Sequence, residues 1–290
     1  MTRVRLTRAL AALLAAVAGI TPVSACQSRS PAASFHRGVS TPPVRRDLPL
    51  AHRVVLGHRG GVEQAHENTM AAFDDAISVG VDYIETDVRH SADGVAFLLH
   101  DPVLPDACTP YAGLEVRVLN AVHLAEVRCA GQPLPRLSDL VSRLERPDAA
   151  RISVMVEVKD VDPLGVRDEL APLGWSRVLI QSFDLAALRE IEQASPQVRT
   201  CPLFWTADVA DRALAVTHDC VGPEFHAVDA GLVAKAHAAG AVVFPFTVDD
   251  PAAMRSLIEL GVDGLITDRP RLAREALGLD HHRNQARQPQ

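Results

Sequence analysis

The chain has 290 residues, of which 48% are hydrophobic, 22% charged and 4% aromatic. These proportions are typical of a globular protein, and they exclude a collagen, a coiled coil and a chain that is disordered throughout. The formal net charge is −7 and the Lys and Arg residues form no dense run. Nucleic-acid binding needs clustered positive charge, so a small-molecule partner is the better expectation.

The first 25 residues have the pattern of a leader that directs export. Three arginines precede an apolar run over 9–20, and the segment ends on Val23-Ser24-Ala25-Cys26. This run is shorter than the roughly 20 apolar residues of a transmembrane helix. The small residues before Cys26 resemble a bacterial lipoprotein signal, in which the cysteine is acylated and the chain is cut just before it. We therefore expect an exported protein, anchored outside the cytoplasm to the cell membrane through Cys26; a plain secretory peptide cut near Ala25 is the alternative.

The chain after the leader divides into a tether, a body and a tail. Residues 26–50 are rich in Ser, Pro and Arg without periodic apolar positions, which predicts a flexible tether. The body covers residues 51–280, and residues 281–290 are expected to form a disordered tail. In the body, short β-branched runs alternate with amphipathic stretches, which is the pattern of repeated βα units.

Eight strands and several helices are predicted in the body. The strands cover 54–57, 83–88, 152–158, 178–182, 200–204, 226–229, 242–247 and 264–267. Helices include 69–79, 185–194, 232–239 and 252–260, and the last two end at Gly240 and Gly261, a residue that helix ends favour. Eight units in about 230 residues favour an α/β fold of the (β/α)₈ TIM barrel type over a doubly wound open sheet.

An extra strand and an insertion follow the second predicted strand. The apolar run 95–99 comes after an Asp93-Gly94 turn and is expected to form a hairpin with that strand. Residues 102–137 would then be an insertion in the second βα connection. Because exported proteins meet oxidising conditions, we predict disulfides between the cysteines that are neighbours in sequence. These are Cys108–Cys129 and Cys201–Cys220, and four reduced buried thiols are the alternative.

Polar side chains gather at the predicted strand ends, where a barrel carries its catalytic groups. They are His58 and Arg59 after the first strand, Glu85 and Asp87 on the second, His100 after the hairpin, and Glu157 and Lys159 on the third. Glu85 and Asp87 are two residues apart, so both side chains point to the barrel interior and need a compensating cation or a shared proton. With Glu157 they form an all-oxygen set that suits Ca²⁺ or Mg²⁺ rather than zinc.

Short motifs follow one another through the body in a fixed order. They are His58-Arg59-Gly60, Glu67-Asn68-Thr69, Ala72-Phe73, Glu85-Thr86-Asp87, Asp93-Gly94, His100-Asp101, Glu157-Val158-Lys159, Gln181-Ser182-Phe183-Asp184 and Asp263-Gly264-Leu265-Ile266-Thr267-Asp268. Over about residues 53–272, their order and spacing resemble the glycerophosphodiester phosphodiesterase family. The resemblance implies a (β/α)₈ barrel that hydrolyses glycerophosphodiesters to sn-glycerol 3-phosphate and an alcohol.

The resemblance also implies a role for each matching residue. A divalent cation, Ca²⁺ or Mg²⁺, would be held by Glu85, Asp87 and Glu157, while Arg59 and Lys159 would contact the phosphate. His58 and His100 would be the acid–base pair, and we assign His58 as the base and His100 as the acid.

Neighbouring motif residues are expected to support the site. Glu67 is expected to bond to Arg59 or to the first histidine, and Asn68 fits the N-terminal cap of the following helix. Gln181, Ser182 and Phe183 are candidates for the pocket lining. The sequence departs from the family pattern at Phe246, where a Trp is usual, and this bears on the shape of the pocket.

Several other functions remain as alternatives. A related barrel lipase of the phospholipase D or sphingomyelinase D kind would keep the histidines and carboxylates, but the sequence shows no apolar loop for lipid docking. A phosphodiesterase that degrades glycerol phosphate polymers such as teichoic acid is a variant of the first hypothesis. A glycosidase would use paired carboxylates, yet it needs neither His58 nor His100. A lipoprotein that binds glycerophosphodiesters without turnover is the non-enzymatic alternative.

Overall fold

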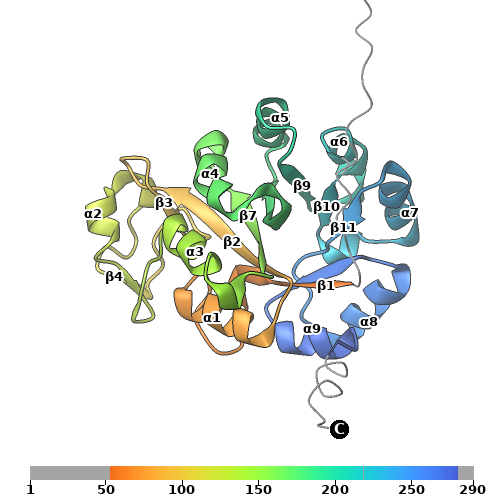
Figure 1. The fold of residues 1–290 in the computed structure, drawn as a ribbon, viewed down its shortest axis with the longest axis horizontal. Helices are drawn as coiled ribbons and strands as arrows, with labels where there is room; N and C mark the ends of the chain where they lie inside the picture. The colour runs from red at the N-terminus through yellow and green to blue at the C-terminus, as the bar shows by residue number, and fades with distance from the viewer. Residues whose placement is uncertain (1–52, 218, 280–290) are drawn as a thin grey trace, which may run out of the picture. The chain divides into compact units, whose positions relative to one another are not determined.

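Eight parallel strands form the centre of the computed structural model, which describes residues 53–217 and 219–279 (Figure 1). The predicted leader, the lipid anchor on Cys26, the tether and the tail lie outside the described residues. Within the described ranges, no helix combines the length and the apolar character that crossing a bilayer requires. The barrel strands are β1 (Val54–Gly57), β2 (Tyr83–His90), β7 (Ser153–Val158), β8 (Val178–Ser182), β9 (Arg199–Phe204), β10 (Cys220–Pro223), β11 (Val242–Val243) and β12 (Gly264–Thr267).

The strands lie side by side in the order β11-β10-β9-β8-β7-β2-β1-β12. Backbone hydrogen bonds join the two ends of this series and close the barrel. The Asp263 N–H donates to the Val243 carbonyl at 3.1 Å, and the Ile266 N–H donates to the Pro245 carbonyl at 3.0 Å. The structure therefore confirms the predicted (β/α)₈ barrel.

Helices surround the strands because their apolar faces pack on the outside of the barrel (Figure 1). Side chains of Thr69, Asp184, Asp229 and Asp250 accept backbone N–H groups at helix starts. Gly240 and Gly261 end α7 and α8 in the left-handed conformation, as expected. The helices are α1 (Met70–Val79), α2 (Ala121–Leu124), α3 (Leu137–Leu144), α4 (Pro163–Leu170), α5 (Leu185–Ala194), α6 (Ala210–Leu214), α7 (Ala230–Ala239), α8 (Pro251–Leu260) and α9 (Pro270–Ala276).

Alternate residues of each strand face two different cores. One core lies between strands and helices, and the other fills the barrel interior. The interior cluster contains Leu56, Tyr83, Met155, Leu179, Cys201, Cys220, Phe244 and Ile266. Two residues further along many of these strands, the inward positions become polar or aromatic, so the apolar interior forms the floor beneath the polar groups.

The hairpin and the insertion also form as predicted. Strand β3 (Ala96–Leu98) pairs antiparallel with β2, and Val88 lies opposite Leu98. The insertion carries a small sheet of β4 (Cys108–Thr109), β5 (Arg128–Cys129) and β6 (Gln132–Pro133), to one side of the barrel in Figure 1. Cys108 and Cys129 are register partners and form a disulfide, and Cys201 and Cys220 form the second one inside the barrel. Both predicted pairings are confirmed.

The sixth barrel strand is not where the sequence placed it. Residues 226–229 were expected to form this strand, but β10 precedes them and Phe225–Ala227 is a 3₁₀ turn. The Gly and Pro of β10 resemble turn residues, yet Gly222 is needed for close packing: a Cβ there would lie 2.5 Å from the Cδ2 atom of Leu203. The seventh strand is shorter than the predicted 242–247, since β11 covers only Val242–Val243.

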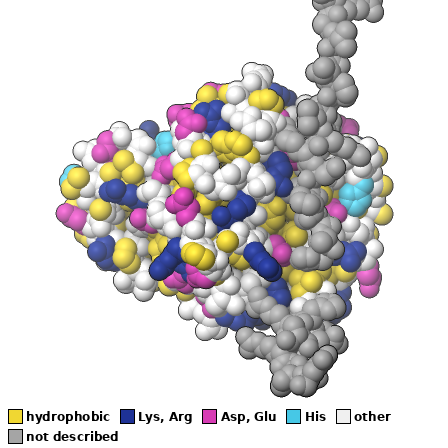
Figure 2. All heavy atoms as spheres, in the orientation of Figure 1, with side chains coloured by type: hydrophobic (Ala, Val, Ile, Leu, Met, Phe, Trp, Pro, Cys, Tyr) yellow, Lys and Arg dark blue, Asp and Glu magenta, His cyan; other side chains and the backbone are white. Residues whose placement is uncertain are grey.

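Charged side chains of both signs are interspersed on the face drawn in Figure 2. Among the described residues visible there, Lys and Arg form no broad single-sign patch. This distribution agrees with the absence of a dense basic run in the sequence.

Candidate active site

Six of the ionisable residues singled out in the sequence line one pocket at the carboxyl ends of the barrel strands. Apolar and aromatic side chains complete the lining together with Gln181 and Thr247. The six are His58, Arg59, Glu85, His100, Glu157 and Lys159, and the others include Phe183, Leu203, Trp205, Phe246 and Ile266. Asp87 is buried beside them, Glu67 contacts Arg59, and Cys26 lies outside the described residues. The barrel therefore brings together residues that are far apart in the sequence, and His58 and Ile266 of this lining are 208 positions apart.

Glu85, Asp87 and Glu157 form a buried carboxylate trio, a name used below for these three residues. One oxygen from each lies within 4.8 Å of the others, and the residues are only 1%, 1% and 7% exposed. They meet because Asp87 and Glu157 are register partners on β2 and β7, while Glu85 is two residues before Asp87 on the same face.

The positive side chains near the trio do not compensate all three of its carboxylates. Burial and the charge of Asp87 raise the pKa of Glu85 to about 8. Burial likewise raises the pKa of Glu157 to about 7, despite the ammonium group of Lys159. Burial opposes ionisation of Asp87 too, but Lys159 and Arg59 more than offset it and lower the pKa of that carboxyl.

This donor set fits a divalent cation of the Ca²⁺ or Mg²⁺ type. All three groups offer oxygen, and a cation would offset the burial and the mutual repulsion that disfavour ionisation of Glu85 and Glu157. Gln181 adds a further neutral oxygen next to the trio. Its Nε2 donates to Glu85 Oε1 at 2.7 Å, and its buried Oε1 has no hydrogen-bond partner among the described residues.

Two cationic side chains reach across the trio. Lys159 Nζ lies 2.5 Å from Glu157 Oε1 and 3.4 Å from Asp87 Oδ1. Arg59 Nε lies 3.3 Å from Asp87 Oδ2, and its NH1 donates to both oxygens of Glu67 at 2.9 and 3.0 Å. The expected contact between Glu67 and Arg59 is therefore present, and it orients the guanidinium group at the pocket wall.

The backbone at Arg59 is also adapted to the site. Arg59 has a positive φ of 52°, which non-glycine residues adopt rarely and at a cost of about 1–3 kcal/mol. In this conformation its N–H donates to Glu85 Oε2 at 2.9 Å. The turn after β1 thus binds a carboxylate of the trio through its backbone and places His58 and Arg59 side by side in the lining.

His58 is the deeper of the two histidines, with a side chain only 15% exposed. Its Nδ1 lies 2.7 Å from Asp268 Oδ1, so Nε2 is the nitrogen left to exchange a proton in the pocket. Burial lowers the pKa of His58, but the hydrogen bond to Asp268 and the charge of Glu85 outweigh it, and the pKa is raised. Asp268 is held in turn, because its N–H donates to Asp249 Oδ1 at 2.8 Å.

His100 lies nearer the pocket mouth, with its side chain 36% exposed. Its Nδ1 is 2.7 Å from Asp101 Oδ1, and burial lowers its pKa despite the charge of Asp87. The backbone around His100 is tied to β2 at two points. Leu99 N–H donates to the Asp87 carbonyl at 3.1 Å, and Arg89 Nε donates to the His100 carbonyl at 2.8 Å.

Asn68 does not cap the following helix as expected. Thr69 is the N-terminal cap of α1, since its Oγ1 accepts the Ala72 N–H at 3.2 Å. Asn68 has a positive φ of 53° and turns its side chain toward β2 instead. Its Nδ2 donates to Asp87 Oδ2 at 3.0 Å, and its Oδ1 accepts from the Thr86 hydroxyl at 2.7 Å. Asn68 therefore orients a carboxylate of the trio.

The sequence did not lead us to predict the hydrogen bond of Asp268 with His58, that of Arg89 with the His100 carbonyl, or the presence of Trp205 in the pocket. A usable signal existed for two of them, because inward positions recur every second residue along a strand. Asp268 lies two residues beyond the interior Ile266, and Trp205 lies four beyond the interior Cys201. The contact of Arg89 follows from the hairpin register and carries no comparable signal.

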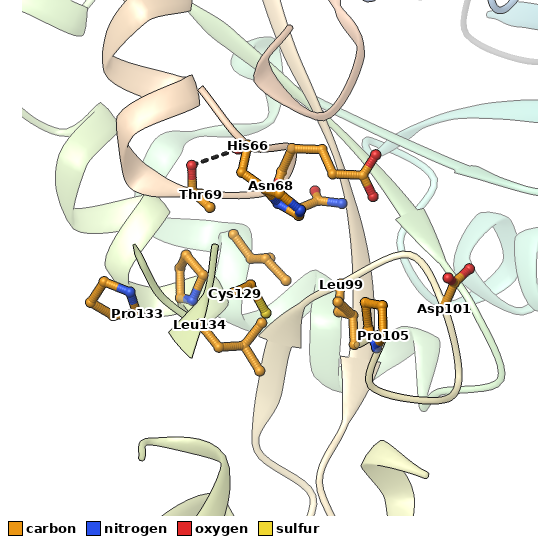
Figure 3. Close-up of a pocket in the computed structure, with 12 residues that line it drawn as sticks. His66, Asn68, Thr69, Leu99, Asp101, Pro105, Cys129, Pro133 and Leu134 are labelled. Carbon is orange, nitrogen blue, oxygen red and sulfur yellow. Dashed lines mark hydrogen bonds between the residues drawn. The ribbon is translucent and has the colours of Figure 1, made fainter. Parts of the chain in front are cut away.

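A second cavity lies between the barrel and the insertion (Figure 3). Apolar side chains and prolines make up much of its lining, including Leu99, Pro105, Cys129 and Leu134. Its volume of about 20 Å³ has room for about one water molecule. In Figure 3 the Thr69 hydroxyl donates to the His66 carbonyl at the edge of this space, at 2.6 Å. Neither His58, His100 nor the trio lines it, so it is a packing space under the insertion.

Comparisons with known proteins cover most of the barrel. The model of the glycerophosphoryl diester phosphodiesterase family matches residues 58–272. A Mycobacterium tuberculosis protein named probable glycerophosphodiester phosphodiesterase 2 is 34% identical over 247 residues, which span 78% of this chain and 90% of that protein. A glycerophosphodiester phosphodiesterase of Caldanaerobacter subterraneus subsp. tengcongensis is 29% identical over 233 residues, spanning 75% and 94% of the two chains.

A solved structure supports the same assignment. The crystal structure of a glycerophosphodiester phosphodiesterase from Agrobacterium tumefaciens has a TM-score of 0.67 and 27% identity, and the match covers 77% of this chain and 98% of that one. The family match begins at His58 and extends past Asp268, so it contains every described residue of the site. The chain therefore belongs to the glycerophosphoryl diester phosphodiesterase family and is an enzyme.

Proposed function

We propose that this enzyme hydrolyses glycerophosphodiesters to sn-glycerol 3-phosphate and an alcohol, with a divalent cation and two histidines. The observation that carries the proposal is the shared pocket of the trio, His58 and His100 at the strand ends of a family member. Each histidine has its Nδ1 bonded to a carboxylate, at Asp268 and Asp101 respectively. Both rings therefore have a free Nε2 for proton transfer.

Glu85, Asp87 and Glu157 would hold the cation, and Ca²⁺ and Mg²⁺ both suit their oxygen ligands. The bound ion would act as a Lewis acid toward a phosphoryl oxygen. Arg59 and Lys159 supply the remaining positive charge for the phosphate. They would stabilise the negative charge that develops on the phosphoryl oxygens in the transition state.

The histidines divide the proton transfers. His58, fixed by Asp268, takes the proton from the glycerol hydroxyl next to the phosphate, and that oxygen attacks phosphorus. His100 donates a proton to the departing alcohol oxygen as its bond to phosphorus breaks, which leaves a cyclic glycerol phosphate. In the second step water opens the ring with the two roles exchanged, and sn-glycerol 3-phosphate is released. In the protein without substrate, the pKa of His58 is raised and the pKa of His100 is lowered. The negative charge of a bound phosphodiester would act on both values.

Identification of the products tests this reaction. Glycerophosphocholine is incubated with the soluble chain that begins after Cys26, and ³¹P NMR follows the phosphorus. Glycerol 3-phosphate is expected; phosphocholine would mean that the other ester bond breaks and would contradict the proposal. Intact lysophospholipid and a glycerol phosphate polymer serve as further substrates. Turnover of either of these with no turnover of glycerophosphocholine would favour the lipase or the teichoic acid alternative.

Asp268→Asn is expected to move the acidic limb of the pH–rate profile to lower pH. The free base must be neutral, so activity falls as the pH drops below the pKa of His58. Asp268 raises that pKa, and its removal lowers it. The rate at the optimum should also fall, by up to about 100-fold, since the imidazole is no longer oriented. The profile of kcat/KM against pH checks this, and a limb that stays in place would contradict the role of Asp268.

Arg89→Met is expected to lower kcat about 3- to 10-fold and to leave KM unchanged. Arg89 is outside the pocket lining but bonds the His100 carbonyl, so its loss affects the position of the acid and not substrate binding. Arg89→Lys keeps a donor and should recover part of the rate. Steady-state kinetics of both variants provide the test. An unchanged kcat in Arg89→Met, or a rise in KM alone, would contradict a positioning role.

A further inference from the structure

Three aromatic side chains form one wall of the pocket, called the aromatic wall below: Phe183 after β8, Trp205 after β9 and Phe246 after β11. The Phe183 and Trp205 rings stack with centroids 5.2 Å apart. Phe246 meets both edge to face, at 5.8 Å from Phe183 and 5.5 Å from Trp205. The three rings thus form one continuous apolar surface that faces the same space as the trio and the histidines.

Phe246 packs on the interior apolar cluster, but folding does not account for the other two rings of this wall. Trp205 is 63% exposed and Phe183 37%, so much of their surface stays in water and contributes little to the core. Two residues earlier on β9, the inward side chain of Leu203 already forms the pocket floor, and Trp205 extends above it. Exposed aromatic surface at the mouth of a polar pocket is typical of a ligand contact.

The depth of the two histidines indicates which half of the substrate meets the wall. His58, the proposed base for the glycerol hydroxyl, is the more buried ring and is held by Asp268 beyond β12. His100, the proposed acid for the leaving alcohol, is the more exposed ring. The half of the diester that extends toward the mouth is therefore the leaving alcohol, and Trp205 is the most exposed lining residue there.

Charge around the wall is one-sided. The strand ends and loops over 180–184, 203–209, 221–226 and 244–250 contain no Lys or Arg, and the first arginines after the first two of them, Arg189 and Arg212, lie within α5 and α6. The same segments contain Asp184, Asp208, Glu224, Asp249 and Asp250. The positive side chains of the pocket, Arg59 and Lys159, follow β1 and β7 instead. An alcohol at the wall therefore meets aromatic faces within a negatively charged half of the rim.

We propose that the aromatic wall is the subsite for the leaving alcohol and that it selects alcohols ending in a trimethylammonium group. This inference rests on the proposed function. Methyl groups of such a cation pack on the rings, and its charge is attracted to the ring faces, with Trp the strongest of the aromatic partners. The acidic half of the rim adds a longer-range attraction. A neutral polyol gains from neither interaction, and a neutral alkyl group gains only the packing.

The test compares four diesters that differ only in the leaving alcohol. Glycerophosphocholine carries the cation with its methyl groups, and the 3,3-dimethylbutyl diester has the same shape without charge. Glycerophosphoethanolamine has charge without methyl groups, and glycerophosphoglycerol has neither. kcat/KM is measured for the wild type, Trp205→Ala, Trp205→Phe and the control Val122→Ala, which removes an exposed apolar side chain from the insertion. Thermal melting verifies that each variant folds.

Trp205→Ala should lower kcat/KM for glycerophosphocholine about tenfold, mainly through KM, and leave glycerophosphoglycerol within about twofold. Trp205→Phe should recover most of the loss, and Val122→Ala should change nothing. Equal losses on all four diesters, or no loss on glycerophosphocholine, would overturn the subsite. An equal loss on the choline diester and on its uncharged isostere would overturn the role of charge. If the wild type releases glycerol 3-phosphate from none of the diesters, it is the proposed function that fails.

Discussion

His58→Ala and His100→Ala are each expected to lower kcat for glycerol 3-phosphate release about 10²- to 10⁴-fold, the usual contribution of a general acid or base. Each ring has one nitrogen bonded to a carboxylate and the other free in the pocket. Both rings line the pocket without being part of the apolar cores, so the variants should fold. Steady-state rates and thermal melting of the two variants measure this effect.

A substrate with an acidic leaving group separates the two roles. The 4-nitrophenyl diester of glycerol phosphate releases nitrophenolate, which needs no proton from the enzyme. His100→Ala should therefore regain much of the wild-type rate on this substrate, while His58→Ala should stay inactive because the glycerol hydroxyl still has to lose its proton. The reverse pattern would exchange the roles of the two histidines. Equal losses on both substrates would contradict any division of proton transfer.

Glu85→Gln is expected to have opposite effects on the stability of the metal-free protein and on its response to metal. The pKa of Glu85 is raised to about 8 from an ordinary 4.5, so the folded state holds this proton more tightly than the unfolded chain. The stability linked to Glu85 is complete below pH 4.5 and is lost as the pH rises toward 8, by a few kcal/mol, to order of magnitude. Glutamine has no such proton to lose, so the variant should be the more stable protein at pH 8 without metal.

Metal should reverse this order. Binding of Ca²⁺ or Mg²⁺ to the trio stabilises the wild type by mass action, and the variant has lost one charged ligand. The wild type should therefore melt at a higher temperature with metal than without, whereas the variant should respond weakly and lose most of its activity. Melting curves at pH 6 and pH 8, each with EDTA or metal, provide the data. An equal metal response in both proteins would remove Glu85 from the site.

Much of the fold could be predicted because barrel strands have a local signature. The β-branched runs at 54–57, 178–182 and 264–267 coincide with β1, β8 and β12. The seventh strand is shorter than predicted, and the clearest exception is β10, whose Gly222 serves close packing against Leu203, a contact that depends on the neighbouring strand. Local residue preferences cannot distinguish such a glycine from one in a turn.

The site was predictable where residue spacing determines direction, and less so where contacts depend on closure of the barrel. Glu85 and Asp87 face the same side because they are two residues apart on a strand. The bond between His58 and Asp268 joins the first strand end to the last, over 210 residues, and requires the pairing of β1 with β12. The aromatic wall likewise joins single residues from three strand ends, so the sequence contains no continuous apolar segment that would have revealed it.

The most direct single measurement is the release of glycerol 3-phosphate from glycerophosphocholine by the metal-stripped chain that begins after Cys26, before and after Ca²⁺ or Mg²⁺ is added. We predict negligible release without metal and recovery with at least one of the two ions. The trio would hold the cation, and the positive charge of that cation is needed beside the phosphate. Undiminished release by the metal-free protein would contradict the assignment of Glu85, Asp87 and Glu157 as a functional metal site.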